Sequence, residues 1–86
     1  MESIWIAVLY ISQATATKIA GKHDMTVVEV RDAVVCVSGL PFRWDDHPER
    51  GLRAVVTTTV RDFEVALVLY PAGDDTWNLG SVYRVS

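Results

Sequence analysis

The sequence predicts an α+β fold in which two N-terminal helices pack on an antiparallel sheet, in the order β-α-α-β-β-β. Three observations predict it. Half of the 86 residues are hydrophobic, which is typical of a folded domain. Helix-capping signals fall in the first half of the chain. Apolar residues alternate with other residues in the second half, as they do in strands. The length allows a single domain, residues 1–86, with a modest core that a partner chain could extend.

The N-terminal segment predicts a strand followed by a short helix. Residues 3–11 form an apolar run between polar neighbours, and we expect a strand there. Ser12 is a suitable N-cap for a helix that runs to about Ala20. Gly21 follows at the expected C-terminal end, with Lys22 and His23 beside it to complement the helix dipole.

Residues 26–37 carry two opposing signals. Their many β-branched side chains favour a strand. Thr26 and Glu29, however, have the spacing of a capping box, and valines recur behind them at helical intervals. We therefore expect a helix over 26–37, with a strand as the alternative.

The second half predicts three strands. Residues 52–60 alternate in polarity, and Arg61 and Asp62 are few enough for a hairpin turn into residues 63–71. The strand at 63–71 is apolar on both faces, which places it in the middle of the sheet. After the turn residues of PAGDDT comes a third strand, 77–85. The residues expected on one of its faces are Trp77, Leu79, Tyr83 and Val85.

The most polar segment of the chain is 40–53, LPFRWDDHPERGLR. We expect Asp45 and Asp46 to cap a turn in it and to pair with nearby arginines. With both helices on one face of the sheet, the other face remains for a ligand or partner. The arginines expected on that face are Arg53, Arg61 and Arg84.

Cysteine content and charge bound the possible functions. A single cysteine, Cys36, excludes an internal disulfide and favours a reducing compartment, with a buried structural thiol as the simplest role. The short apolar run at the N-terminus has neither the length of a membrane span nor the basic start of a signal peptide, so we expect a cytoplasmic protein. A net charge of −3 disfavours non-specific nucleic-acid binding unless the cations share one face.

The candidate catalytic residues are two histidines with nearby cations. Metal-independent RNA cleavage needs a proton acceptor, a proton donor and fixed positive charge, and His23, His47, Lys22 and the arginines could supply them. The ordinary interpretation is that such residues are common in any domain of this size. Trp44, beside Arg43, could stack on a base or complete the core.

A metal site is a weaker hypothesis. Asp45, Asp46 and His47, with His23, offer suitable ligand types, but adjacent residues do not easily face one ion and no CxxC or HxxxH spacing is present. Cys36 lies in an apolar context that would not activate a thiol. We therefore predict no metal and no cofactor.

Two short motifs resemble a known family. The segment KIAGKHDMTVVEVRDAV is similar to the "KHGVS.EEV" block of BrnT-like toxins, and WDDHPERGLRAVV resembles their "D..H...ER" passage. The similarity extends over residues 16–86 and includes the strands to SVYRVS. BrnT-like toxins belong to the RelE/ParE superfamily of small mRNA-cleaving domains that a partner antitoxin silences.

The resemblance implies a toxin of a type II toxin–antitoxin module that cleaves mRNA without a metal. Its partners would be a cognate antitoxin, which silences it in a complex, or a second copy in a homodimer, and its substrate would be RNA. Glu49 also matches a motif residue of the family in the polar segment. The residues implied in catalysis are Lys22, His23, His47, Arg50 and Arg84. The candidate RNA contacts are Arg43, Trp44, Arg53 and Arg61. The alternative is a non-catalytic module of the same fold that binds a protein partner.

Overall fold

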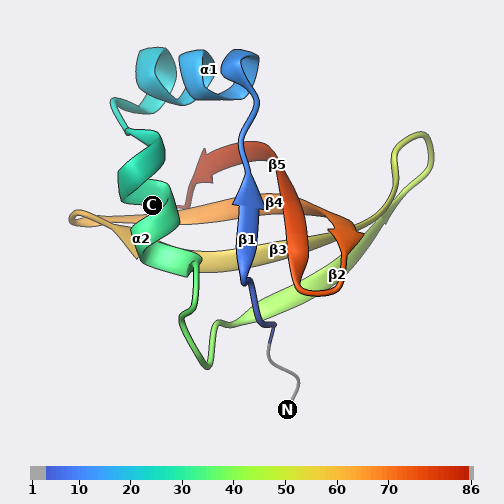
Figure 1. Cartoon of the computed structure of the whole chain (residues 1–86). Coiled ribbons are helices and arrows are strands. Elements are labelled where there is room, and N and C mark those ends of the chain that lie inside the picture. Colours follow the sequence, from blue (N-terminus) through green and yellow to red (C-terminus); the bar gives the residue numbers. More distant parts are fainter. Residues whose placement is uncertain (1–3, 86) are drawn as a thin grey trace.

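The computed structural model describes residues 4–85, which form two helices and a five-stranded sheet (Figure 1). The elements are β1 Val8–Tyr10, α1 Gln13–His23, α2 Val27–Val34, β2 Phe42–His47, β3 Gly51–Val60, β4 Phe63–Gly73 and β5 Thr76–Arg84. The α+β class is confirmed. The order is β-α-α-β-β-β-β, with one strand more than the sequence predicted.

The sheet is mixed rather than purely antiparallel. Its strand order is β1-β5-β4-β3-β2, and β1 pairs parallel with β5 while the other neighbours are antiparallel. The prediction of an antiparallel sheet is therefore wrong at this edge. Parallel neighbours need a long connection, and both helices and three strands lie between β1 and β5 in the chain. The central place of β4 agrees with its apolar faces.

The unpredicted strand is β2, which forms from the polar segment. Asp45 and Asp46 lie in this strand, opposite Arg53 and Leu52 of β3, so the prediction that they cap a turn is wrong. An edge strand has one side in solvent and tolerates the charged residues that hid its character in the sequence. The expected pairing of Asp45 with arginines is confirmed by its contacts with Arg53 and Arg43.

The N-terminal strand is shorter than predicted. Strand β1 covers Val8–Tyr10, and Ile4 makes an isolated bridge to Leu40. Ser3, the predicted first residue of the strand, lies outside the described residues. The strand is short because β1 has a partner only along the first residues of β5, from Thr76 to Asn78.

Helix α1 begins as predicted and ends later. The Ser12 hydroxyl accepts a hydrogen bond from the Thr15 N–H at 3.2 Å. The helix runs through Gly21 to His23, and Asp24 closes it in the left-handed conformation at φ 53°. The predicted end near Ala20 is therefore too early, because an aspartate and not the glycine adopts the left-handed cap.

Helix α2 resolves the ambiguity of residues 26–37 in favour of a helix. Thr26 Oγ1 accepts from the Glu29 N–H at 3.2 Å, and Glu29 Oε1 accepts from the Thr26 N–H at 3.0 Å. This reciprocal capping box is the predicted one. The helix stops at Val34 and Cys36 adopts φ 57°, which leaves the thiol exposed. The prediction of a buried thiol is therefore wrong.

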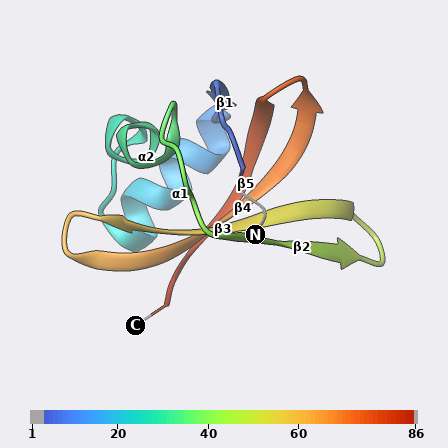
Figure 2. The same cartoon turned by 90° about the horizontal axis from the view of Figure 1, so that it is seen from below.

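Both helices lie on the same side of the sheet, and the β2–β3 hairpin extends away from them (Figure 2). Ile19, Val30 and Val34 belong to one apolar cluster with sheet residues on that side. Those sheet residues include Val56, Val60, Val65, Leu67, Leu69, Leu79 and Val82. The opposite side, which we call the open face, carries the intervening residues of β2 to β5.

A bulge in β5 changes which residues reach the open face. Leu79 pairs with Leu69 and Ser81 pairs with Val68, so Gly80 is the extra residue. After the bulge Val82 is buried and Tyr83 is 55% exposed. The prediction that Trp77, Leu79 and Tyr83 share a face is wrong, because an uninterrupted alternation cannot anticipate a bulge.

Candidate functional site

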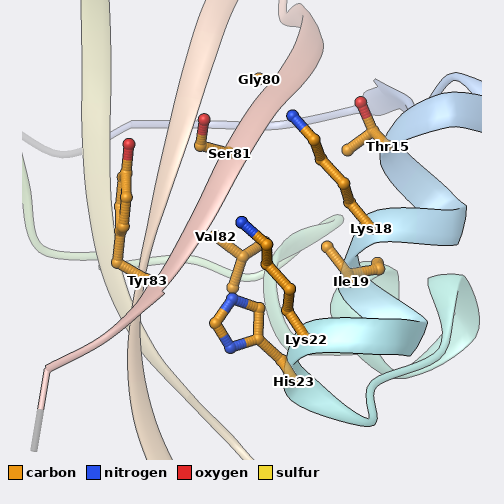
Figure 3. Close-up of a pocket in the computed structure, with 9 residues that line it drawn as sticks. All are labelled: Thr15, Lys18, Ile19, Lys22, His23, Gly80, Ser81, Val82 and Tyr83. Carbon is orange, nitrogen blue, oxygen red and sulfur yellow. The ribbon is translucent and has the colours of Figure 1, made fainter.

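The described residues form a groove of about 280 Å³ between α1 and the second half of β5 (Figure 3). On the helix side, the lining residues follow the spacing i, i+3, i+4, i+7, i+8 and so form one face of α1. They are Thr15, Lys18, Ile19, Lys22 and His23. On the sheet side the groove is lined by Gly80, Ser81, Val82 and Tyr83. Strand β1 pairs only with β5 residues before Leu79, which leaves this edge of β5 facing α1.

The groove is cationic. Figure 3 shows the side chains of Lys18, Lys22 and His23 extending from α1 toward β5, which carries the Ser81 hydroxyl, while the Tyr83 side chain lies on the far side of β5. Among the described residues that line the groove there is no carboxylate. No ion pair joins either lysine to another residue of 4–85. This combination of ammonium, imidazole and hydroxyl groups suits a phosphate ligand.

Arg84 contacts the C-terminal end of α1, next to the groove. Its Nη2 donates to the His23 carbonyl oxygen at 3.2 Å, and its guanidinium lies 4.0 Å from the centre of the Phe63 ring. Arg84 pairs in register with the core residue Val65, which puts it on the helix side. The prediction that Arg84 lies on the open face is therefore wrong. Its contact satisfies a carbonyl of the last turn of α1.

Arg61, at the β3–β4 turn, is also on the helix side. Its Nη2 donates to Glu29 Oε1 at 2.9 Å, its Nε bonds Glu29 Oε2, and its Nη1 lies 3.6 Å from Asp24 Oδ2. Hydrogen bonding to Arg61 lowers the pKa of Glu29 to about 2. The predicted open-face position of Arg61 is wrong, because this pair connects the turn to the start of α2.

His47 and Arg50 lie at the other end of the sheet. The Nδ1 atom of His47 accepts from the backbone N–H groups of Glu49 and Arg50, both at 3.1 Å, and so caps the β2–β3 turn. Along the paired strands, seven residues separate the positions of His47 and Arg84, three on β3 and four on β4. At about 3.3 Å per residue this is roughly 20 Å. The five predicted catalytic residues therefore form two separate groups.

The predicted RNA contacts of β2 and β3 divide between the two faces. Arg43 and Arg53 are on the open face with Asp45, whose Oδ2 is 2.6 Å from Arg53 Nε. The hydrogen bond from Arg53 lowers the pKa of Asp45. Trp44 is one residue from Arg43 and so points to the helix side, 45% exposed, against Phe42 and Trp77.

Sequence reasoning missed four groove or open-face residues. Lys18, Ser81 and Tyr83 line the groove, and Tyr70 lies on the open face beside Arg53. The helical spacing of Lys18 with Lys22 and His23 was a readable signal. No sequence signal exists for Ser81 and Tyr83, because their position depends on the bulge at Gly80.

Across the part of the chain that the structure describes, no group of three or more His, Cys, Asp or Glu side chains could hold a metal ion. Neither helix within residues 4–85 is long and apolar enough to cross a membrane. The fold and site define a small α+β domain with a cationic groove at one edge of its sheet. Comparison with protein-family models, curated proteins and solved structures finds no match to the chain, so the BrnT-like resemblance stays a prediction.

Proposed function

We propose that this protein is a metal-independent endoribonuclease, the toxin component of a type II toxin–antitoxin module, and that RNA is cleaved in the groove between α1 and β5. The observation that carries the proposal is the convergence of Lys18, Lys22 and His23 on one groove without a carboxylate among its described lining residues. Two of these three residues are also the KH pair of the toxin resemblance.

The chemistry assigned to the groove is an in-line transesterification. His23 takes the proton of the 2′-hydroxyl as the bond from that oxygen to phosphorus forms. The ammonium of Lys22 stabilises the charge of the phosphorane and gives a proton to the 5′-oxygen as its bond to phosphorus breaks. Lys18, one helical turn before Lys22, holds the non-bridging oxygens. Arg84 is a positioning residue that fixes the backbone of His23 through its carbonyl.

The test is induced expression in a bacterial host, with growth followed and RNA ends mapped by primer extension. Native protein should arrest growth and create new RNA ends, and Lys22→Ala should remove both. Arg31→Gln is the charge-matched control, because Arg31 lies outside the groove and bonds the Leu9 carbonyl. Normal growth and intact RNA with folded native protein would contradict the proposal.

A second candidate function, a non-catalytic module that binds a protein partner, is favoured by one observation. Trp44 and Leu52 are exposed on the helix-side face at the end of the sheet away from the helices. Large exposed apolar side chains that lie together mark interaction sites. This candidate predicts that Trp44→Ala leaves RNA ends unchanged and weakens a partner complex recovered with the native protein.

A further inference from the structure

The open face carries a row of residues that crosses four strands. In register, Ser81 of β5 pairs with Val68, Val68 pairs with Val55, and Val55 pairs with Arg43 of β2. Val68 and Val55 are only 2% and 8% exposed, although they point away from the helices and lie outside the main core cluster. The row therefore has an apolar centre recessed between larger side chains. At one end of the row Ser81 borders the groove, and at the other end lies Arg43.

A second polar cluster lies beside this row. The ring of Tyr70 covers Gly80 so closely that a Cβ at Gly80 would lie 2.3 Å from the Tyr70 Cε2 atom. The Tyr70 hydroxyl is buried and has no hydrogen-bond partner of normal geometry among the described residues. Burial raises the pKa of Tyr70, but the guanidinium groups of Arg53 and Arg50 lower it by more. The hydroxyl is thus held next to two cations.

Arg53 retains free donors in this cluster. Its Nε is bound to Asp45, and its side chain is 20% exposed. A guanidinium has five N–H donors, so N–H groups beyond those directed at Asp45 and Tyr70 remain for a ligand oxygen. Arg53 and Arg50 therefore offer N–H donors that a phosphate group accepts, beside the buried Tyr70 hydroxyl.

We propose that Arg50, Arg53 and Tyr70 form a second phosphate-binding site, and that a single strand of RNA crosses the open face from this site into the groove between α1 and β5. The inference rests on the proposed function for its substrate. Tyr83, which is 55% exposed beside the groove, stacks on one of the bases.

The spacing of the two sites sets the length of the ligand. From β5 to β3, which carries Arg53, there are two strand spacings, and Arg53 lies two residues along β3 from Val55, the β3 position in register with Ser81. At about 4.8 Å per strand and about 3.3 Å per residue the sites are roughly 12 Å apart. A stacked single strand rises about 3.4 Å per nucleotide, so about four nucleotides connect the sites. Shorter oligonucleotides reach only one of them.

The experiment measures binding without cleavage. Fluorescein-labelled oligothymidylates of two, four, six and eight nucleotides lack the 2′-hydroxyl, and their binding to the full chain is followed by anisotropy at several salt concentrations. For the native protein we expect affinity to rise to about four nucleotides and then level off, with a gain of at least about tenfold from the second site. A hexaglutamate peptide is the control for a general affinity for anions.

The variants separate the two sites. The double variant Arg53→Gln/Asp45→Asn removes the cation without leaving an unpaired carboxylate, and its eight-nucleotide ligand should bind no better than the dinucleotide. Asp45→Asn alone should keep the length dependence. Tyr70→Phe keeps the ring over Gly80 and should lose part of the length dependence. Circular dichroism checks folding.

Each outcome has one meaning. Length-independent binding to the native protein, or length dependence that survives the double variant, overturns the second site. Hexaglutamate binding as tight as that of the longest oligonucleotide overturns nucleic acid as its ligand. Failure of the proposed function is seen separately, as RNA left intact by a protein that still binds oligothymidylates with the expected length dependence.

Discussion

The two ends of the sheet hold cations in different ways. At the β2–β3 end Arg53 is bound to Asp45, and the Nδ1 atom of His47 caps a turn. At the α1 end Lys18 and Lys22 extend into a groove and form no ion pair with another residue of 4–85. A carboxylate neutralises part of the charge of the cation that it binds, whereas unpaired cations in a groove keep their full charge for a ligand. The comparison therefore favours the groove at α1 as the proposed site of RNA cleavage.

The largest effect is expected for the two histidines. His23→Ala should lower the rate of RNA cleavage by at least about a hundredfold, because general base catalysis contributes that much. His47→Asn should change the rate far less, because an amide oxygen can replace Nδ1 as the acceptor of the turn. Single-turnover cleavage of a short RNA measures both. Equal losses in the two variants would contradict the division of roles between the ends of the sheet.

The next largest effect is on the salt dependence of RNA binding. Lys18→Ala removes one phosphate contact in the groove, so RNA affinity should fall and the slope of log affinity against log salt should decrease by roughly 0.7, the value for one contact to a single strand. Arg31→Gln removes the same charge outside the groove and should leave the slope unchanged. Titrations at four salt concentrations give the slope. An identical slope in native protein and Lys18→Ala would show that this lysine does not meet phosphate.

A smaller effect tests the packing between the two regions. Gly80→Ala places a Cβ 2.3 Å from the Tyr70 ring, which must then move. Inserting a methyl group into a close contact costs about 1–3 kcal/mol. Urea denaturation should show this loss of unfolding free energy in Gly80→Ala. In a double-mutant cycle, Gly80→Ala should cost less in the Tyr70→Ala background than in the native protein, and an equal cost in both would mean that the ring is not the obstacle.

The sequence predicted those parts of the fold that depend on local signals. The capping box of Thr26 and Glu29 and the turn at Arg61 and Asp62 were readable, because each uses residues that are close in the chain. The strand β2 was missed because an edge strand needs no apolar alternation. The positions of Arg61 and Arg84 were wrong because they depend on a turn and a bulge that connect distant segments.

The candidate site was predictable only in part, for the same reason. Lys22 and His23 lie on one face of a single helix, so local spacing brings them together. His47 was assigned to the same site from its residue type and from motif resemblance, and Arg50 from the resemblance, but the register of β3 and β4 puts them roughly 20 Å away. Pairing register is a long-range property that residue spacing does not carry.

A further prediction concerns the cap of α2, which contributes stability independently of either site. Thr26→Ala removes the hydroxyl that accepts from the Glu29 N–H, and an N-cap of this kind contributes about 1 kcal/mol. Thr26→Ser keeps the hydroxyl and should be close to native. Urea denaturation compares them, and RNA affinity should be unchanged in both. A change in RNA affinity at native stability would instead implicate α2 in the site.

The smallest effect is a pH dependence at the Glu29–Arg61 pair. Hydrogen bonds from Arg61 and, to a smaller extent, from Thr26 lower the pKa of Glu29 from 4.5 to about 2, so the folded protein holds the proton less tightly than the unfolded chain does. The stabilisation is therefore complete above about pH 4.5 and is lost as the pH falls toward about 2. Glu29→Gln keeps a side-chain oxygen for the capping box and removes only the charge. Melting temperatures of native protein and Glu29→Gln should differ near neutral pH and converge in acid, and the difference should shrink with added salt because both side chains reach solvent. A difference that persists at pH 2 would mean that Glu29 acts through its hydrogen bonds and not through its charge.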